Sequence, residues 1–173
     1  MKYKPFKSTK SESFKNWCIR LLFNLVPAYR GTGGWIKFIS ADWREVHIRL
    51  RLSIVTRNYV GTIFGGSMFS ATDPFYMIML MKNLGKHYVV WDKSSSIRYL
   101  RPGKKVLHGR FLVTQEVLDE IKEKVAVEGE YEKDLIIELI NTAGKVSSSV
   151  VKHIYIADKS FYKEKRRKKE AQV

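Results

Sequence analysis

The sequence predicts an α+β fold in which an antiparallel sheet surrounds one apolar helix. Residues 44–55 alternate between apolar and polar side chains, which is the period of a strand with one face in a core. Residues 59–81 form a mostly apolar stretch with a single charge, which we interpret as a buried helix. Further strand-like runs fill residues 88–156. One buried helix among antiparallel strands is typical of a sheet wrapped around that helix.

An amphipathic helix and two strands are expected before the central helix. Residues 11–27 carry apolar side chains at helical spacing, and residues 1–10 form a basic N-terminal arm ahead of them. A short strand is expected at 35–39, before the long one at 44–55. One face of the long strand carries Val46, Ile48, Leu50, Leu52 and Ile54, and the other carries His47, Arg49, Arg51 and Ser53.

The remaining elements are expected in a simple order. A turn at 58–66 leads into the central helix, which runs to about Leu84 and ends at Gly85. The expected later elements are strands at 88–91 and 95–100, 106–114, 125–131, 135–141 and 145–156, with a short helix at 115–124. The basic tail, 159–173, is expected to be a solvated helix. We expect the whole chain, 1–173, to form one domain.

Composition indicates which compartment and which kinds of partner to expect. The chain has 173 residues, 45% of them hydrophobic, which is enough for a core. Its net charge of +15 favours anionic partners: nucleic acid, a membrane surface or a phosphate-bearing ligand such as coenzyme A. The single cysteine, Cys18, excludes an intramolecular disulfide and favours a reducing compartment, so we expect a cytoplasmic protein. The polar residues and glycines within 59–81 argue against a transmembrane span.

Asp73 is the most unusual residue of the apolar stretch, because it is the only charge there. Burying an unpaired carboxylate costs several kcal/mol, so such a group is often functional. Asp73 followed by Pro74 also matches the start of a helix, with Asp as N-cap and Pro at the first helical position. Gly65 and Gly66 likewise allow two interpretations: backbone donors for an oxyanion, or a turn that needs glycine. The residues alone leave both pairs of alternatives open.

Other kinds of site find little support in the sequence. The four histidines, His47, His87, His108 and His153, have no partners at ligand spacing, so we expect no metal site. No serine lies in a nucleophile motif, and no dinucleotide or phosphate-loop motif is present. We do not expect a nucleic-acid partner, because no known module pattern accompanies the charge. The basic residues Arg98, Arg101, Lys104 and Lys105 are expected either to hold phosphates or to form a solvated loop.

One set of spacings resembles a known family. The matching residues are Asn58, Gly61, Phe64, Gly65, Gly66, Phe69 and Asp73. They resemble the motif of hotdog thioesterases of the phenylacetate-pathway (PaaI) type, which carries His-Gly-Gly and then an Asp on the central helix. Three further stretches resemble an uncharacterised bacterial hotdog family known only as a domain of unknown function: Asp73-Pro74-Phe75, Val90-Trp91-Asp92-Lys93 and Arg101-Pro102-Gly103. The similarity spans roughly residues 14–157.

The resemblance implies an acyl-CoA thioesterase on a hotdog fold. It implies a homodimer, or a dimer of two such dimers, with active sites at the dimer interface. Asp73 would be the general base or nucleophile, the amides of Gly65 or Gly66 would stabilise the oxyanion, and Asn58 would orient water or the carbonyl. Ser67, Ser70 and Thr72 would line the site. From the residues themselves we expect the acyl chain to lie along Phe64 and Phe69, and the phosphates to contact Arg98, Arg101 and Lys104. No cofactor is implied beyond the coenzyme A of the substrate.

Phe64 departs from the family motif, because the related enzymes carry histidine at this position. A phenyl ring cannot donate the hydrogen bond that histidine can. The alternative is therefore a hotdog protein that binds an acyl or acyl-CoA ligand without cleaving it.

Overall fold

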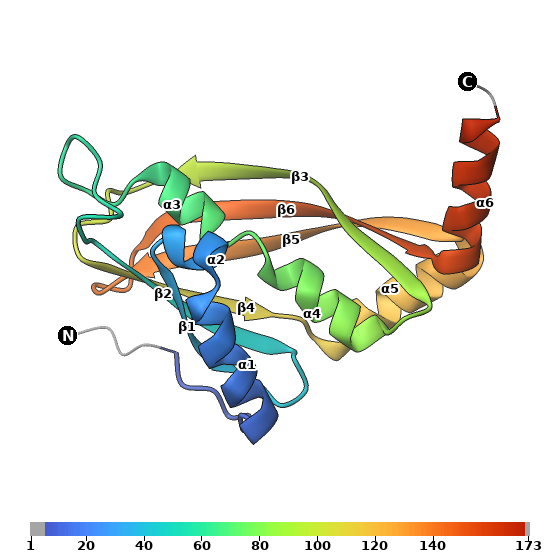
Figure 1. Cartoon of the computed structure of the whole chain (residues 1–173), viewed down its shortest axis with the longest axis horizontal. Coiled ribbons are helices and arrows are strands. Elements are labelled where there is room, and N and C mark those ends of the chain that lie inside the picture. The colour runs from blue at the N-terminus through green and yellow to red at the C-terminus, as the bar shows by residue number, and fades with distance from the viewer. Residues whose placement is uncertain (1–5, 172–173) are drawn as a thin grey trace.

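The computed structural model describes residues 6–171, so the first five residues of the expected arm and the last two of the tail lie outside the described part. Six strands form one antiparallel sheet in the order β1-β2-β4-β5-β6-β3, which curves around α4 (Figure 1). The elements are α1 (Phe14–Leu25), α2 (Pro27–Gly31), β1 (Gly34–Ile39), β2 (Glu45–Arg51), α3 (Gly65–Ser70), α4 (Phe75–Leu84), β3 (Tyr88–Tyr99), β4 (Val106–Leu112), α5 (Gln115–Glu128), β5 (Glu130–Asn141), β6 (Val146–Asp158) and α6 (Lys159–Glu170).

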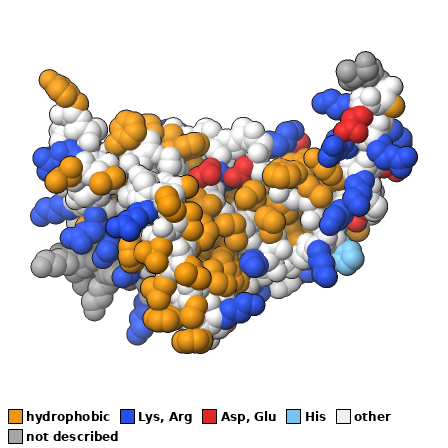
Figure 2. Space-filling model, in the orientation of Figure 1, with side chains coloured by type: hydrophobic (Ala, Val, Ile, Leu, Met, Phe, Trp, Pro, Cys, Tyr) orange, Lys and Arg blue, Asp and Glu red, His pale blue; other side chains and the backbone are white. Residues whose placement is uncertain are grey.

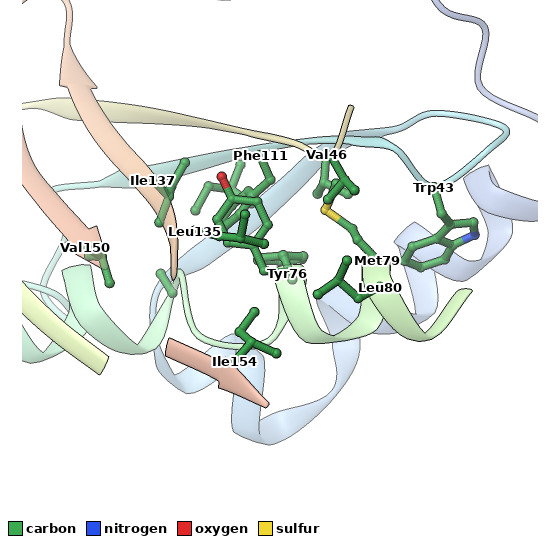
Figure 3. Packing of buried hydrophobic residues seen from close by; sticks show 14 of the residues in the cluster. Trp43, Val46, Tyr76, Met79, Leu80, Phe111, Leu135, Ile137, Val150 and Ile154 are labelled. Atoms are coloured by element: carbon green, nitrogen blue, oxygen red, sulfur yellow. The ribbon is translucent and has the colours of Figure 1, made fainter. Parts of the chain in front are cut away.

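The core lies between α4 and the concave face of the sheet. Tyr76 and Met79 of α4 point toward Phe111 of β4 and Val46 of β2 (Figure 3). The rings of Tyr76 and Phe111 meet edge to face with 5.0 Å between their centroids. The buried Tyr76 hydroxyl also donates to the Ile136 carbonyl oxygen at 2.7 Å. Apolar burial and this hydrogen bond together fix α4 on the sheet.

Strand β2 confirms the alternation, but it is shorter than expected. Val46 and Ile48 are buried in the core, whereas Arg49 lies on the opposite face. The expected strand continued to Val55, but β2 ends at Arg51, because the chain turns there. The Thr56 hydroxyl donates to the Arg51 carbonyl oxygen at 2.6 Å, which bends the backbone out of the sheet.

The expected long central helix is two helices, α3 and α4, with a break at residues 71–74. The Thr72 and Asp73 amides donate to the carbonyls three residues earlier, which tightens the chain after α3. Pro74 has no N–H to continue an α-helical ladder, and α4 begins at Phe75. The break presents Asp73 on a turn instead of on a helix face.

The expected strand at 125–131 is wrong in its first half, because α5 continues to Glu128. Leu118, Ile121 and Val125 are all buried, and their spacing is that of one helix face. Gly129 then ends the helix with φ 80°, a left-handed conformation that glycine adopts without strain. The tail confirms a solvated helix: α6 has no buried residue and extends away from one end of the sheet (Figure 1).

Helix α1 is held by polar contacts, and most of its predicted apolar stripe is exposed. The buried Asn24 side chain exchanges two hydrogen bonds with the backbone of Ile36 in β1, at 2.8 and 3.1 Å. Phe14 and Leu22 are 79% and 66% exposed, so this stripe lies on the surface of the single chain. Among residues 6–171, no helix has the length and hydrophobicity needed to cross a membrane.

Candidate functional site

Asp73 lies at the helix break with a carboxylate that is 57% exposed in the single chain. The expectation of a deeply buried carboxylate is therefore wrong for this chain. The N-cap alternative is wrong as well: α4 is preceded by Pro74, and no side chain caps it. Asp73 instead forms an ion pair that crosses from the helix layer to the sheet.

Lys152 is the partner of Asp73, and it is almost fully buried in β6, with 1% of its side chain exposed. Its ammonium lies 2.7 Å from Oδ1 of Asp73 and 2.8 Å from Oδ2 of Asp92 in β3. A buried ammonium needs this compensation, because desolvation without a counter-charge is very unfavourable. The two carboxylates therefore anchor Lys152, and Lys152 in turn fixes one oxygen of Asp73.

An apolar cavity of about 500 Å³ opens beside Asp73. Phe69 and Ser70 of α3 line it together with the first two helices, through residues such as Phe23 and Tyr29. Burial raises the pKa of the Tyr29 hydroxyl, so this ring contributes an uncharged wall. Figure 2 shows hydrophobic side chains gathered around acidic ones on this face of the molecule. The cavity therefore combines a carboxylate with an apolar lining.

Gly65 and Gly66 open α3, as expected, but they line a different groove, of about 630 Å³. Both glycines are closely covered by aromatic rings. A Cβ on Gly65 would lie 2.8 Å from Cζ of Tyr99, and one on Gly66 would overlap the ring of Phe64. An alanine at either position would displace the end of an exposed aromatic ring, so glycine lets these rings lie against the start of α3. The first N–H groups of a helix have no acceptor within it, so these amides remain potential donors.

The other predicted site residues lie in the two hollows, in the core or on the exposed surface. Asn58, Phe64 and Arg101 line the groove of the two glycines. Asn58 uses its side chain locally, since its Oδ1 accepts from the Thr62 amide at 2.9 Å.

Four further predicted residues lie away from both hollows. Ser67 and Thr72 are buried, and the Thr72 hydroxyl donates to the Phe69 carbonyl oxygen at 2.7 Å. Arg98 and Lys104 are exposed and line neither hollow. The single chain therefore does not bring Asp73 and the glycine pair into one cavity.

Sequence reasoning missed Lys152 and Asp92, although a signal existed for the lysine. Val150, Lys152 and Ile154 occupy successive inward positions of β6, and all three are buried. A lysine on an otherwise apolar strand face indicates a buried counter-charge. The identity of that counter-charge could not be read, because Asp73 is 79 positions away in the chain.

Within residues 6–171, no group of three or more His, Cys, Asp and Glu side chains is arranged to hold a metal ion. The site chemistry described above consists of a carboxylate, an ammonium, backbone amides and apolar walls.

Solved structures with this fold come from several bacteria. A probable thioesterase of unknown function from Pseudomonas aeruginosa superimposes with a TM-score of 0.72 at 15% identity, over 85% of this chain and 98% of that one. A protein of unknown function from Chlorobaculum tepidum gives 0.65 at 15% identity, over 82% and 93%. A thioesterase from Haemophilus influenzae gives 0.58 at 13% identity, over 86% and 93%. At such low identity, these superpositions establish the fold alone, and they confirm the expected hotdog fold.

Comparison by sequence gives the family. No curated protein matches the chain. The model of the family described as "Domain of unknown function (DUF4442)" matches residues 15–156, close to the span over which the resemblance was seen. The chain therefore belongs to the DUF4442 family of unknown function, and it has the hotdog fold found in bacterial thioesterases.

Proposed function

We propose that the chain hydrolyses acyl-CoA thioesters, with Asp73 as the general base or the nucleophile. The observation that carries this proposal is the position of Asp73: an accessible carboxylate, anchored by a buried lysine, at the edge of an apolar cavity. The thioesterases among the structures with this fold support the reaction class.

The chemistry follows from the two oxygens of the carboxylate. Lys152 binds Oδ1 of Asp73, and no partner of Oδ2 is described within residues 6–171. Oδ2 can take a proton from a water that attacks the thioester carbonyl, or it can attack that carbon directly. Negative charge then develops on the carbonyl oxygen and needs preorganised donors. The amides of Gly65 and Gly66 are the donors that we propose. The carbon–sulfur bond then breaks, and coenzyme A leaves as a thiolate that takes up a proton. On the nucleophilic route, water then hydrolyses the anhydride formed between the acyl group and Asp73.

A site that uses both Asp73 and the glycine pair requires two chains, because in one chain they line separate hollows. Strand β3 ends the sheet, so one of its edges lacks a strand partner, and its exposed side chains include Trp91 and Tyr99. Such edges pair readily with another strand. We propose a homodimer, or a dimer of two such dimers, in which Asp73 of one copy faces the glycine amides of another.

The two hollows suit the two halves of an acyl-CoA. The acyl chain would occupy the apolar cavity beside Asp73, between Phe23 and Phe69. The phosphates would lie against Arg101, which lines the glycine groove, with the exposed Arg98 and Lys104 nearby in the sequence. Coenzyme A enters only as part of the substrate.

The test is thiol release from acyl-CoAs of increasing chain length by the purified protein. Asp73→Asn should lower kcat/KM by at least about a hundredfold, the usual effect of losing a general base. Unchanged turnover in that variant would eliminate the proposed role. Sedimentation analysis tests the assembly, and a fully active monomer would rule out a site shared between chains.

A second candidate function is binding of an acyl or acyl-CoA ligand without cleavage. Two observations favour it: Phe64 replaces the histidine of related enzymes, and Lys152 already holds one oxygen of Asp73. Native mass spectrometry distinguishes the two candidates. A co-purified acyl ligand without thiol release would support binding alone, whereas rapid turnover would exclude it.

A further inference from the structure

A further cavity, separate from the two hollows described above, lies on the other face of the sheet, away from α4 and Asp73. It has a volume of about 410 Å³ and lies between strands β1, β2 and β4 and the N-terminal segment. Its charged and titratable lining comes from different parts of the chain: Lys7, Lys10, Lys37, His47, Arg49 and His108. It shares no lining residue with the two hollows described above.

The strand period and one bulge assemble this cavity. Residues 46, 48 and 50 of β2 enter the core, so His47 and Arg49 face outward, and Arg49 is paired across the sheet with His108. The register of β1 shifts between Ile36 and Phe38. This irregularity lets Lys37 and Phe38, which are consecutive in the sequence, both line the cavity.

The charge around the cavity is unbalanced. Among the described residues, no carboxylate lines it, and neither Lys37 nor Arg49 has an ion-pair partner. Lys10 is the exception, with Asp42 at 2.7 Å.

The carboxylate beside His47 is already engaged by other side chains. Glu45 is almost fully buried and binds Ser8, His47 and Arg110, each at 2.7 Å. The Nε of Arg49 is buried without any hydrogen-bond partner in the described part of the chain. A buried guanidinium N–H without an acceptor is costly, so an acceptor bound in the cavity, such as an anion, would stabilise Arg49.

The pKa values of both imidazoles that line the cavity are lowered. Burial lowers the pKa of His108, and the neighbouring Arg49 lowers it further. Burial also lowers the pKa of His47, which its hydrogen bond with Glu45 only partly offsets. Both rings are therefore desolvated, and His108 in addition faces the positive charge of Arg49, which a bound anion would offset.

Aromatic rings border the cations. The rings of Phe6 and Phe38 lie 5.7 and 5.1 Å from that of His47, measured between centroids, and both phenylalanines line the cavity. Phenyl faces stack readily on planar rings of ligands.

We propose that this cavity binds a phosphate group carried by a small molecule with a planar ring, as in a nucleoside monophosphate. Arg49 and Lys37 would bind the phosphate oxygens through charge-assisted hydrogen bonds. Phe38 and Phe6 would contact the ring. This site is additional to the thioester site, because the sheet lies between them.

Titration calorimetry at low ionic strength tests the proposal with AMP, inorganic phosphate and adenosine as probes. AMP should bind most tightly, phosphate more weakly and adenosine not detectably. Arg49→Gln and Lys37→Gln should each weaken AMP binding by about tenfold, the effect of one charge-assisted contact. Phe38→Ala should weaken AMP but leave phosphate unchanged.

Arg167→Gln is the matched control, because it removes one positive charge from exposed α6. It should bind AMP like the wild type. Lys37 is exposed on strand β1, so its variant keeps the test valid if Arg49→Gln perturbs folding. The proposal is overturned if neither AMP nor phosphate binds, if adenosine binds as well as AMP, or if Arg167→Gln weakens binding as much as Lys37→Gln and Arg49→Gln do.

Discussion

Removing the two carboxylates around Lys152 should destabilise the protein far more than the separate removals suggest. The ammonium is 1% exposed and binds Asp73 at 2.7 Å and Asp92 at 2.8 Å. After either Asp73→Ala or Asp92→Ala, one counter-charge remains. After both substitutions, a buried charge has none within the described chain.

The magnitudes follow from exposure. The Asp73 side chain is 57% exposed, so solvent screening limits the loss in Asp73→Ala to about 1 kcal/mol or less. Asp92 is 22% exposed, so Asp92→Ala should cost about 1.5–3 kcal/mol, as for a hydrogen bond to a charged group. The double variant should lose at least about 1 kcal/mol beyond the sum of the two, since it leaves an uncompensated ammonium.

Urea unfolding followed by tryptophan fluorescence measures all three variants. Adding Lys152→Met to the double variant should restore at least about 2 kcal/mol, because an apolar side chain of similar length needs no counter-charge. Strict additivity of the two single losses, together with no recovery by Lys152→Met, would refute the view that Lys152 depends on this pair of carboxylates.

Three further predictions concern the glycine groove, the core and the pH dependence. Gly65→Ala should lower the free energy of unfolding by about 0.5–1 kcal/mol more in the wild type than in a Tyr99→Ala background, because the added Cβ displaces the exposed Tyr99 ring; equal losses measured by urea unfolding would contradict this. Tyr76→Phe should cost about 1–2 kcal/mol by leaving the Ile136 carbonyl unpaired, and a change below experimental error would exclude a contribution from that bond. Burial raises the pKa of Asp42, but hydrogen bonds from its neighbours outweigh this and lower it from 3.8 to about 2. Its stabilisation is therefore complete above pH 3.8 and is lost as the pH falls toward about 2, so Asp42→Asn should flatten the loss of stability over this window, and parallel curves would contradict it.

The strands could be predicted because apolar and polar side chains alternate along them, which shows directly which face is buried. The alternation in β2 located its outward face correctly, including the arginine and histidine of the proposed phosphate cavity. The helix break could not be read with the same ease, because Pro74 is equally compatible with the first turn of a helix. The expected helix stopped short of Val125, because a β-branched residue is also typical of a strand. In the structure Val125 is buried on the face that α5 packs against the sheet, so the helix continues through it.

The candidate site was predicted in part. The sequence singled out Asp73 correctly as unusual, but a lone charge in an apolar run says nothing about its partner. Lys152 comes from a strand far along the chain, and only the folded sheet places it beside the helix break. The exposed stripe of α1 shows the same limit from the other side, since periodicity predicts an apolar face but not which surface covers it.

The proposed chemistry is tested most directly by comparing thiol release from acyl-CoA in Asp73→Asn and Asp92→Asn. Both variants remove one carboxylate charge from Lys152, but only Asp73 lines the apolar cavity. We expect Asp73→Asn to lower kcat by at least about a hundredfold and Asp92→Asn by less than about tenfold. Equal rates in Asp73→Asn and the wild type would contradict the assignment of the reaction to this carboxylate.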